Sequence, residues 1–243
     1  MLAVAAIVLV MAAANVATNV LPSRWTVPLC VVAAAVLLAI GLAGGLSAAD
    51  LGFGAGTLLA GLGWAVLLVL AVAVTYAAAG ALPRTRVAFA DRRVTEAGGR
   101  RVAWKALVSI PFGTVLLEEI AFRSVLFGAV LVRFGAGWAV AVTSVLFGLW
   151  HIAPASAMHE SHEAVGAALG TGRRAGLLAV LATVAFTAAA GLVFAGLRLW
   201  TGSVLPPMGL HWAVNGLGVA VAWWLASRHR IGDRAATGTG DAP

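Results

Sequence analysis

The strongest constraint on the fold is a series of seven apolar runs, each near the roughly 20 residues that an α-helix needs to cross a bilayer. Of the 243 residues, 62% are hydrophobic and 10% are charged, a far more apolar balance than in soluble domains. The runs span about 2–20, 26–46, 56–82, 107–132, 137–153, 177–200 and 203–226. They predict an all-α, polytopic transmembrane bundle of about seven helices, or eight if a kink divides the long third run.

The order of these runs predicts three segments. Residues 1–104 hold the N-terminal transmembrane helices and a basic cytoplasmic loop, and residues 105–227 hold a helical core that carries the polar motifs described below. Residues 228–243 are expected to form a disordered cytoplasmic tail. The first helix is expected to be retained, because residues 1–16 lack the basic region that begins a secretory signal.

The net charge of +7 indicates membrane orientation rather than nucleic-acid binding. Arginines crowd the loop before the fourth run and follow the last run, which places both at the cytoplasmic face beside anionic headgroups. We expect a multi-pass protein of the plasma membrane. Fifteen of the sixteen basic residues are arginine, a bias that suggests a GC-rich, bacterial genome. The lone Cys30 excludes an intramolecular disulfide and a Cys-rich metal site.

Two adjacent glutamates, Glu118 and Glu119, are the only acidic residues that fall inside an apolar run. An ionisable side chain in hydrocarbon is costly, so each such residue is a functional-site hypothesis. Arg123 follows Glu119 by four residues and shares its helix face, which predicts an ion pair. Neighbouring residues lie about 100° apart on a helix, so Glu118 is left to face a cavity, where a carboxylate can act as a general base.

Polar residues also occur in two later apolar runs. His151 lies in VLFGLWHIA, and His211 and Asn215 lie four residues apart in PPMGLHWAVNGL. Taken singly, each has a structural explanation: a packing carboxyl at Glu118, a satisfied interface histidine, or a polar pair that joins two helices. Taken together, they supply a base, a group that orients water, and donors for a developing oxyanion, which points to acyl hydrolysis.

Three ordered motifs resemble those of one membrane peptidase family. Glu-Glu-Ile-Ala-Phe-Arg at 118–123 resembles EExxxR, Phe147 to His151 resembles FxxxH, and His211 to Asn215 resembles HxxxN. These are motifs of the CPBP or Abi family of intramembrane glutamic endopeptidases. That family includes the type II CAAX prenyl proteases and bacteriocin-processing or immunity proteins. The resemblance covers about residues 105–226, and the first three helices match no motif.

The resemblance implies a role for each motif residue. Glu118 and His151 would activate a water molecule, while His211 and Asn215 would stabilise the oxyanion. Three further residues would support the site: Glu119, Arg123 and Phe147. The resemblance implies no metal or other cofactor, and a peptide or membrane-protein substrate within the lipid bilayer. Whether that substrate is prenylated stays open.

Two alternatives to this prediction stay open. One is a zinc metallopeptidase with Glu118, His151 and His211 as ligands, and the other is a catalytically silent membrane binding or immunity protein. A further cluster, His-Glu-Ser-His-Glu at 159–163, lacks the HExxH spacing of zinc peptidases and is interpreted as a solvated loop.

Overall fold

The computed structural model describes residues 2–89, 94, 97–159 and 173–237. Helices dominate these residues, and none of the residues in those ranges forms a strand. The predicted all-α membrane bundle is therefore confirmed. The 159–163 cluster lies outside the described residues, apart from His159 at the end of a helix.

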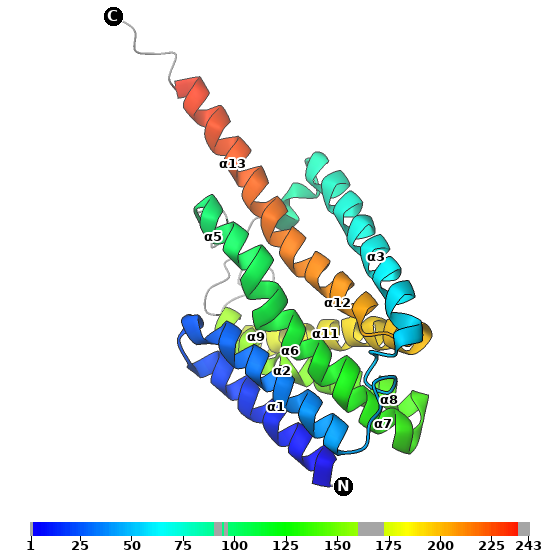
Figure 1. The fold of residues 1–243 in the computed structure, drawn as a ribbon. Coiled ribbons are helices and arrows are strands. Elements are labelled where there is room, and N and C mark those ends of the chain that lie inside the picture. Colours follow the sequence, from blue (N-terminus) through cyan, green and yellow to red (C-terminus); the bar gives the residue numbers. More distant parts are fainter. Residues whose placement is uncertain (1, 90–93, 95–96, 160–172, 238–243) are drawn as a thin grey trace, which may run out of the picture.

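The described chain forms seven rods (Figure 1). Here a rod is one helix or several consecutive helical segments that follow one another. The first three rods are single helices: α1 (Leu2–Val20), α2 (Thr26–Ala43) and α3 (Ala55–Ala81). The fourth rod consists of α5 (Gly99–Trp104), α6 (Leu116–Glu119) and α7 (Leu126–Phe134), the fifth of α8 (Ala136–Trp150) and α9 (Ile152–His159), the sixth of α11 (Arg173–Thr201), and the last of α12 (Leu205–Trp212) and α13 (Gly218–Thr237). Five stretches of these rods are long and apolar enough to cross a membrane as single helices: Ala3–Val20, Ser23–Ala43, Ala55–Ala81, Ala136–Ala155 and Arg174–Thr201.

The fourth and last rods are helical but not uniformly α. The fourth rod contains π-helical turns at Lys105–Ser109, Pro111–Val115 and Ile120–Val125, and the last rod contains one at Ala213–Leu217. Pro111 has no backbone N–H to donate, which favours an irregular turn at that point. π turns are rare and frequently mark functional sites. Here they occur in the two rods that carry EExxxR and HxxxN.

The fourth rod lies at the centre of the bundle, between helices from both halves of the chain. It packs against α2 and α1 on one side and against α8 on another, while α12 packs on α3 and α8 packs on α11 (Figure 1). Leu37, Phe122 and Phe127 are almost wholly inaccessible in the resulting apolar core. This packing encloses the part of the fourth rod that holds the two glutamates.

α8 and α11 approach one another closely through glycines. A Cβ atom built on Gly148 would lie 2.7 Å from the carbonyl oxygen of Val184, and one built on Gly191 would lie 2.9 Å from the Cα of Ser144. Small residues at such contacts let helix backbones pack tightly inside a membrane, where dispersion rather than water exclusion holds helices together. α8 carries Phe147, so this contact positions one wall of the site.

Gly148→Ala is therefore expected to destabilise the bundle by about 1–3 kcal/mol, because the added methyl group meets backbone rather than a flexible side chain. Gly196→Ala on α11 is the matched control, because nothing lies within 4 Å of its added Cβ. Thermal unfolding in detergent should separate the two variants. Equal unfolding temperatures would show that the close contact does not limit the packing.

Arg198, near the end of α11, forms hydrogen bonds to both the 44–54 loop and the fourth rod. Its Nη2 donates to the carbonyls of Ala49 at 3.2 Å and Asp50 at 2.8 Å, and its Nε donates to the carbonyl of Arg123 at 3.0 Å. Ser124 Oγ adds a 2.7 Å hydrogen bond to the carbonyl of Leu51. Arg198 is 3% exposed, so a buried cation is satisfied by backbone carbonyls and holds the π turn that contains Arg123.

The last rod extends further than the sequence predicts. α13 continues to Thr237, so residues 228–237 are helical, contrary to the disordered tail expected from 228. The stretch contains no proline. Its start is tied to the preceding turn by Ser227 Oγ, which donates to the carbonyl of Trp223, and by the Arg228 guanidinium 4.1 Å from the centroid of the Trp224 ring. Local helix contacts therefore continue past the apolar run.

Candidate active site

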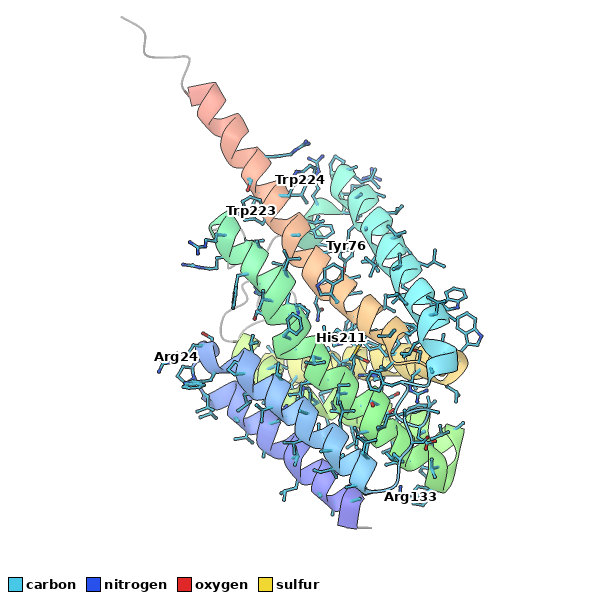
Figure 2. The ribbon with its side chains drawn as sticks, viewed as in Figure 1. Arg24, Tyr76, Arg133, His211, Trp223 and Trp224 are labelled. Atoms are coloured by element: carbon cyan, nitrogen blue, oxygen red, sulfur yellow. The ribbon has the colours of Figure 1, made fainter. Side chains whose placement is uncertain are left out.

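The two glutamates occupy the end of α6, with π turns before and after it. Glu118 is 7% exposed and Glu119 is 0% exposed, so both carboxyl groups are removed from bulk solvent. Figure 2 shows His211 projecting from the last rod toward the fourth rod, deep in the bundle. The two glutamates and His211, which were predicted from different motifs, thus face the same interior space.

Arg123 forms the ion pair that its spacing from Glu119 predicts. Its Nη1 lies 3.4 Å from Glu119 Oε1, and the exposed fraction of both residues is zero. The guanidinium also lies over aromatic rings, 3.9 Å from the Phe147 centroid and 4.9 Å from that of Phe194. Such cation–π contacts strengthen when both groups are desolvated, so the rings compensate part of the cost of burying this cation. Phe147 of the FxxxH motif thereby contacts the EExxxR arginine directly.

His211 contacts both glutamates through opposite edges of its ring. Its Nδ1 lies 2.8 Å from Glu119 Oε1, and its Nε2 lies 3.8 Å from Glu118 Oε2. The separation of about 100° between Glu118 and Glu119 on their helix therefore does not prevent both carboxylates from contacting one residue. They point in different directions from their own helix, but an imidazole from a second helix is wide enough to span the two. The Phe194 ring stacks against His211 at 5.2 Å.

Trp150 belongs to this site although none of the three motifs specifies it. Its indole Nε1 donates to Glu118 Oε1 at 3.1 Å. It lies beside His151 in the sequence, and the only signal was its indole N–H at the end of an apolar helix, where a polar partner is expected. Because Trp150 holds one oxygen of Glu118, the carboxylate is oriented from α8 as well as from its own helix.

His151 follows the end of α8 and is half-buried. Its Nδ1 lies 2.8 Å from the carbonyl oxygen of Phe147, and a carbonyl can only accept. Nδ1 therefore carries the proton, and in a neutral ring Nε2 is the nitrogen with a lone pair. The Phe147 ring packs edge-on against this imidazole at 4.8 Å. The FxxxH spacing thus orients the histidine through a backbone carbonyl.

Asn215 lies in the π turn Ala213–Leu217 and is half-buried. The turn shifts the helical register after His211, because a π turn bonds i to i+5 rather than i to i+4. Two side chains around it secure the last rod: Trp212 Nε1 donates to the carbonyl of Ala106, and Tyr76 Oη donates to the carbonyl of Val214. The segment that carries Asn215 is therefore held on both sides.

The cluster has hydrogen-bonding capacity that its protein neighbours do not use. Within the described chain, Glu118 Oε2, Glu119 Oε2, and the Nε and Nη2 of Arg123 have no hydrogen-bond partner. Buried polar groups are nearly always paired, and exceptions call for a functional explanation. Chemically, the arrangement offers two carboxylate oxygens that can accept a proton, one from each glutamate, beside an imidazole and a fixed cation.

For the peptide hydrolysis that the motif resemblance implies, replacing Trp150 by Phe is expected to lower kcat about tenfold or more, with KM nearly unchanged. The variant keeps an aromatic ring but removes a hydrogen bond to a carboxylate, which contributes about 1.5–3 kcal/mol. Steady-state kinetics of the purified variant provide the measurement. Trp138→Phe, at an exposed position on α8, is the control, and an equal loss in both would contradict a role for the indole N–H.

The zinc alternative lacks a ligand set in the described residues. No group of three His, Cys, Asp or Glu side chains there is arranged to hold a metal ion. Both ring nitrogens of His211 lie against the two glutamates. Glu118, His151 and His211 therefore do not form the three-ligand group that this alternative requires.

The segment that carries the three motifs matches a known protein family. Residues 100–217 match the family model described as Type II CAAX prenyl endopeptidase Rce1-like. This segment belongs to that family. The matched range contains EExxxR, FxxxH and HxxxN, and it agrees with the CPBP resemblance of the sequence. No curated protein and no solved structure gives a significant match. The spanning helices make the chain a multi-pass membrane protein, and its segment 100–217 resembles a protease family.

Proposed function

We propose that this chain is an intramembrane glutamic endopeptidase in which Glu118 and His151 activate a water molecule. The observation that supports it most is the convergence of Glu118, Glu119 and His211 from two rods, all nearly inaccessible, within the Rce1-like segment. Buried carboxylates cost free energy, so a cluster of them supports a chemical role better than a packing role.

In the proposed reaction, the water oxygen attacks the carbonyl carbon of the scissile peptide bond. Glu118 Oε2 takes the proton of the water, and the lone pair on Nε2 of His151 orients that water. The carbonyl oxygen becomes an oxyanion, which accepts hydrogen bonds from His211 and Asn215. The proton held by Glu118 then passes to the leaving amine as the carbon–nitrogen bond breaks, which leaves a new carboxyl terminus and a new amino terminus.

The charges of the cluster are consistent with a hydrogen-bond-donating role for His211. Two carboxylates and the Arg123 guanidinium sum to a net charge of minus one, and an imidazolium at His211 brings the sum to zero. In that form Nδ1 donates to Glu119, and Nε2 carries a proton on the side of Glu118. Glu119 and Arg123 would thus hold the His211 ring in place rather than react themselves.

The proposed substrate is a peptide or membrane-protein segment that reaches the site from the bilayer. We place the protein in the plasma membrane of a bacterium, with processing of either a CAAX-type tail or a leader peptide. A reconstituted sample should therefore cleave a member of a peptide panel that contains farnesylated CAAX peptides and unmodified hydrophobic leaders. Mass spectrometry of the products would identify the scissile bond, and absence of any cleavage across the panel would favour a silent binding protein.

A metal chelator is expected to leave this cleavage unchanged, because neither the base nor the oxyanion donors of the proposal need a metal. The measurement compares initial rates before and after dialysis against a strong zinc chelator. A zinc peptidase of known sensitivity, treated in parallel, shows that the chelation works. Loss of activity that added zinc restores would instead establish the metallopeptidase alternative.

A further inference from the structure

We propose that an open apolar cavity between α3, α5 and α13 binds one anionic phospholipid. The cavity has a volume of about 1050 Å³, at the upper end of the roughly 300–1000 Å³ typical of small-molecule sites. Its lining includes none of the motif residues of the carboxylate site. The proposal therefore concerns a second site and does not depend on hydrolysis.

The walls of the cavity suit a hydrocarbon chain. Apart from two arginines, every described residue that lines it is glycine, aliphatic or aromatic. The polar atoms of two lining aromatics are already engaged, since Tyr76 Oη donates to the Val214 carbonyl and Trp223 Nε1 donates to the Ala97 carbonyl. These side chains therefore present ring surface to the cavity. Figure 2 shows Tyr76 and Trp224 between α3 and the last rod, and Trp223 on the side of α5, all toward the end away from His211.

The two arginines supply positive charge at fixed positions. Arg86 donates from Nε to the Gly80 carbonyl at 2.8 Å and from Nη2 to the Ala81 carbonyl at 3.2 Å, and Arg228 lies over the Trp224 ring. These contacts orient both guanidinium groups but neutralise neither. None of the described lining residues is acidic. A guanidinium binds phosphate oxygens through paired N–H groups, so this charge complements a phosphodiester.

The position of the two arginines favours a lipid phosphate, rather than a soluble anion, as the ligand of this cavity. They belong to the basic loop and the last rod, the two parts of the chain that the charge pattern places at the cytoplasmic face. Basic pockets between transmembrane helices on that face are suited to anionic headgroups. The cavity is open rather than enclosed, so an acyl chain can enter from the bilayer while the phosphate stays at the level of the headgroups.

The test is native mass spectrometry of the full chain in neutral detergent, after exchange with equal amounts of phosphatidylglycerol and phosphatidylcholine with the same acyl chains. We expect one phosphatidylglycerol to be retained per chain in preference to phosphatidylcholine. The Arg86→Gln/Arg228→Gln double variant should lower that preference about fivefold per arginine. Arg24→Gln is the matched control, because Arg24 is an exposed arginine outside the cavity lining.

A second variant tests the acyl-chain part of the proposal. Ala77 lines the cavity at an exposed position of α3, so Ala77→Phe fills space without entering the packed core. It should lower retention of both lipids. Equal retention of the two lipids by the native chain would overturn the proposal, as would an equal effect of Arg24→Gln. Displacement of the lipid by an equimolar farnesylated peptide would also overturn it, since the cavity would then belong to the substrate.

Discussion

Glu118→Gln is expected to lower kcat/KM for peptide cleavage by about 10²–10⁴-fold, the usual contribution of a general base. The amide matches the carboxylate in shape, and its oxygen can still accept from Trp150, but it cannot take a proton from water. The side chain at position 118 loses its negative charge beside His211, which lies 3.8 Å away, but the packing of the two side chains is kept. The thermal unfolding temperature should therefore change little. Steady-state kinetics on a cleaved panel peptide, beside an unfolding scan, give both quantities.

Asp50→Asn makes the same acid-to-amide change outside the site. The Asp50 carboxylate accepts hydrogen bonds from the hydroxyl and backbone N–H of Ser47, which hold its pKa below the usual range, and it lies in the 44–54 loop. The cleavage rate of the Asp50→Asn variant should match the native rate.

In cells, mass spectrometry of membrane peptides should show termini that depend on the native chain and vanish with Glu118→Gln. Full biological effect from the Glu118→Gln form would establish the silent binding protein instead.

Arg123→Leu is expected to destabilise the protein by about 3–5 kcal/mol, because it removes the permanent cation beside two buried carboxylates. The guanidinium is wholly inaccessible, lies 3.4 Å from Glu119, and packs on the Phe147 and Phe194 rings. Denaturation in mixed micelles, followed by tryptophan fluorescence, would measure the free energy of unfolding. A Lys replacement should not fully restore it, since an ammonium group cannot reproduce the planar stacking on these rings.

The combined variant Arg123→Leu/Glu119→Gln shows whether the loss comes from the unpaired charge. Removing both charges should recover part of the stability, because replacing a whole buried pair costs less than breaking it. Arg133→Leu is the control, since Arg133 lies at the end of α7 and donates to the Ala129 carbonyl. It should change stability by no more than about 0.5 kcal/mol. A double variant no more stable than Arg123→Leu would contradict the charge explanation.

Local patterns predicted the membrane fold and the motif residues well. Run length and hydropathy decide whether a helix can span a bilayer, and both are properties of consecutive residues. The Glu119–Arg123 pair was predictable for the same reason, because residues four apart share a helix face. The roles of the site residues stay predictions, as does the division of the chain into segments, apart from the helical stretch 228–237.

The contacts that define the site were not predictable from spacing. Trp150 and His211 reach the glutamates across 32 and 92 residues of sequence, and Arg198 reaches the backbone of Arg123 across 75. Arg198 did give a signal, since it is a charged residue inside the apolar run 177–200. The structure explains it as a buried cation that binds loop carbonyls.

By itself the sequence determined that the chain is a membrane helix bundle and which rare polar residues lie within it, because burying backbone and charge in lipid leaves few alternatives. Only the tertiary structure decided that one imidazole touches both glutamates, that an indole holds Glu118, and that π turns flank the pair. Those features depend on how the rods are rotated and how closely they approach. Packing between distant segments sets both, and the spacing of residues along one helix carries no information about them.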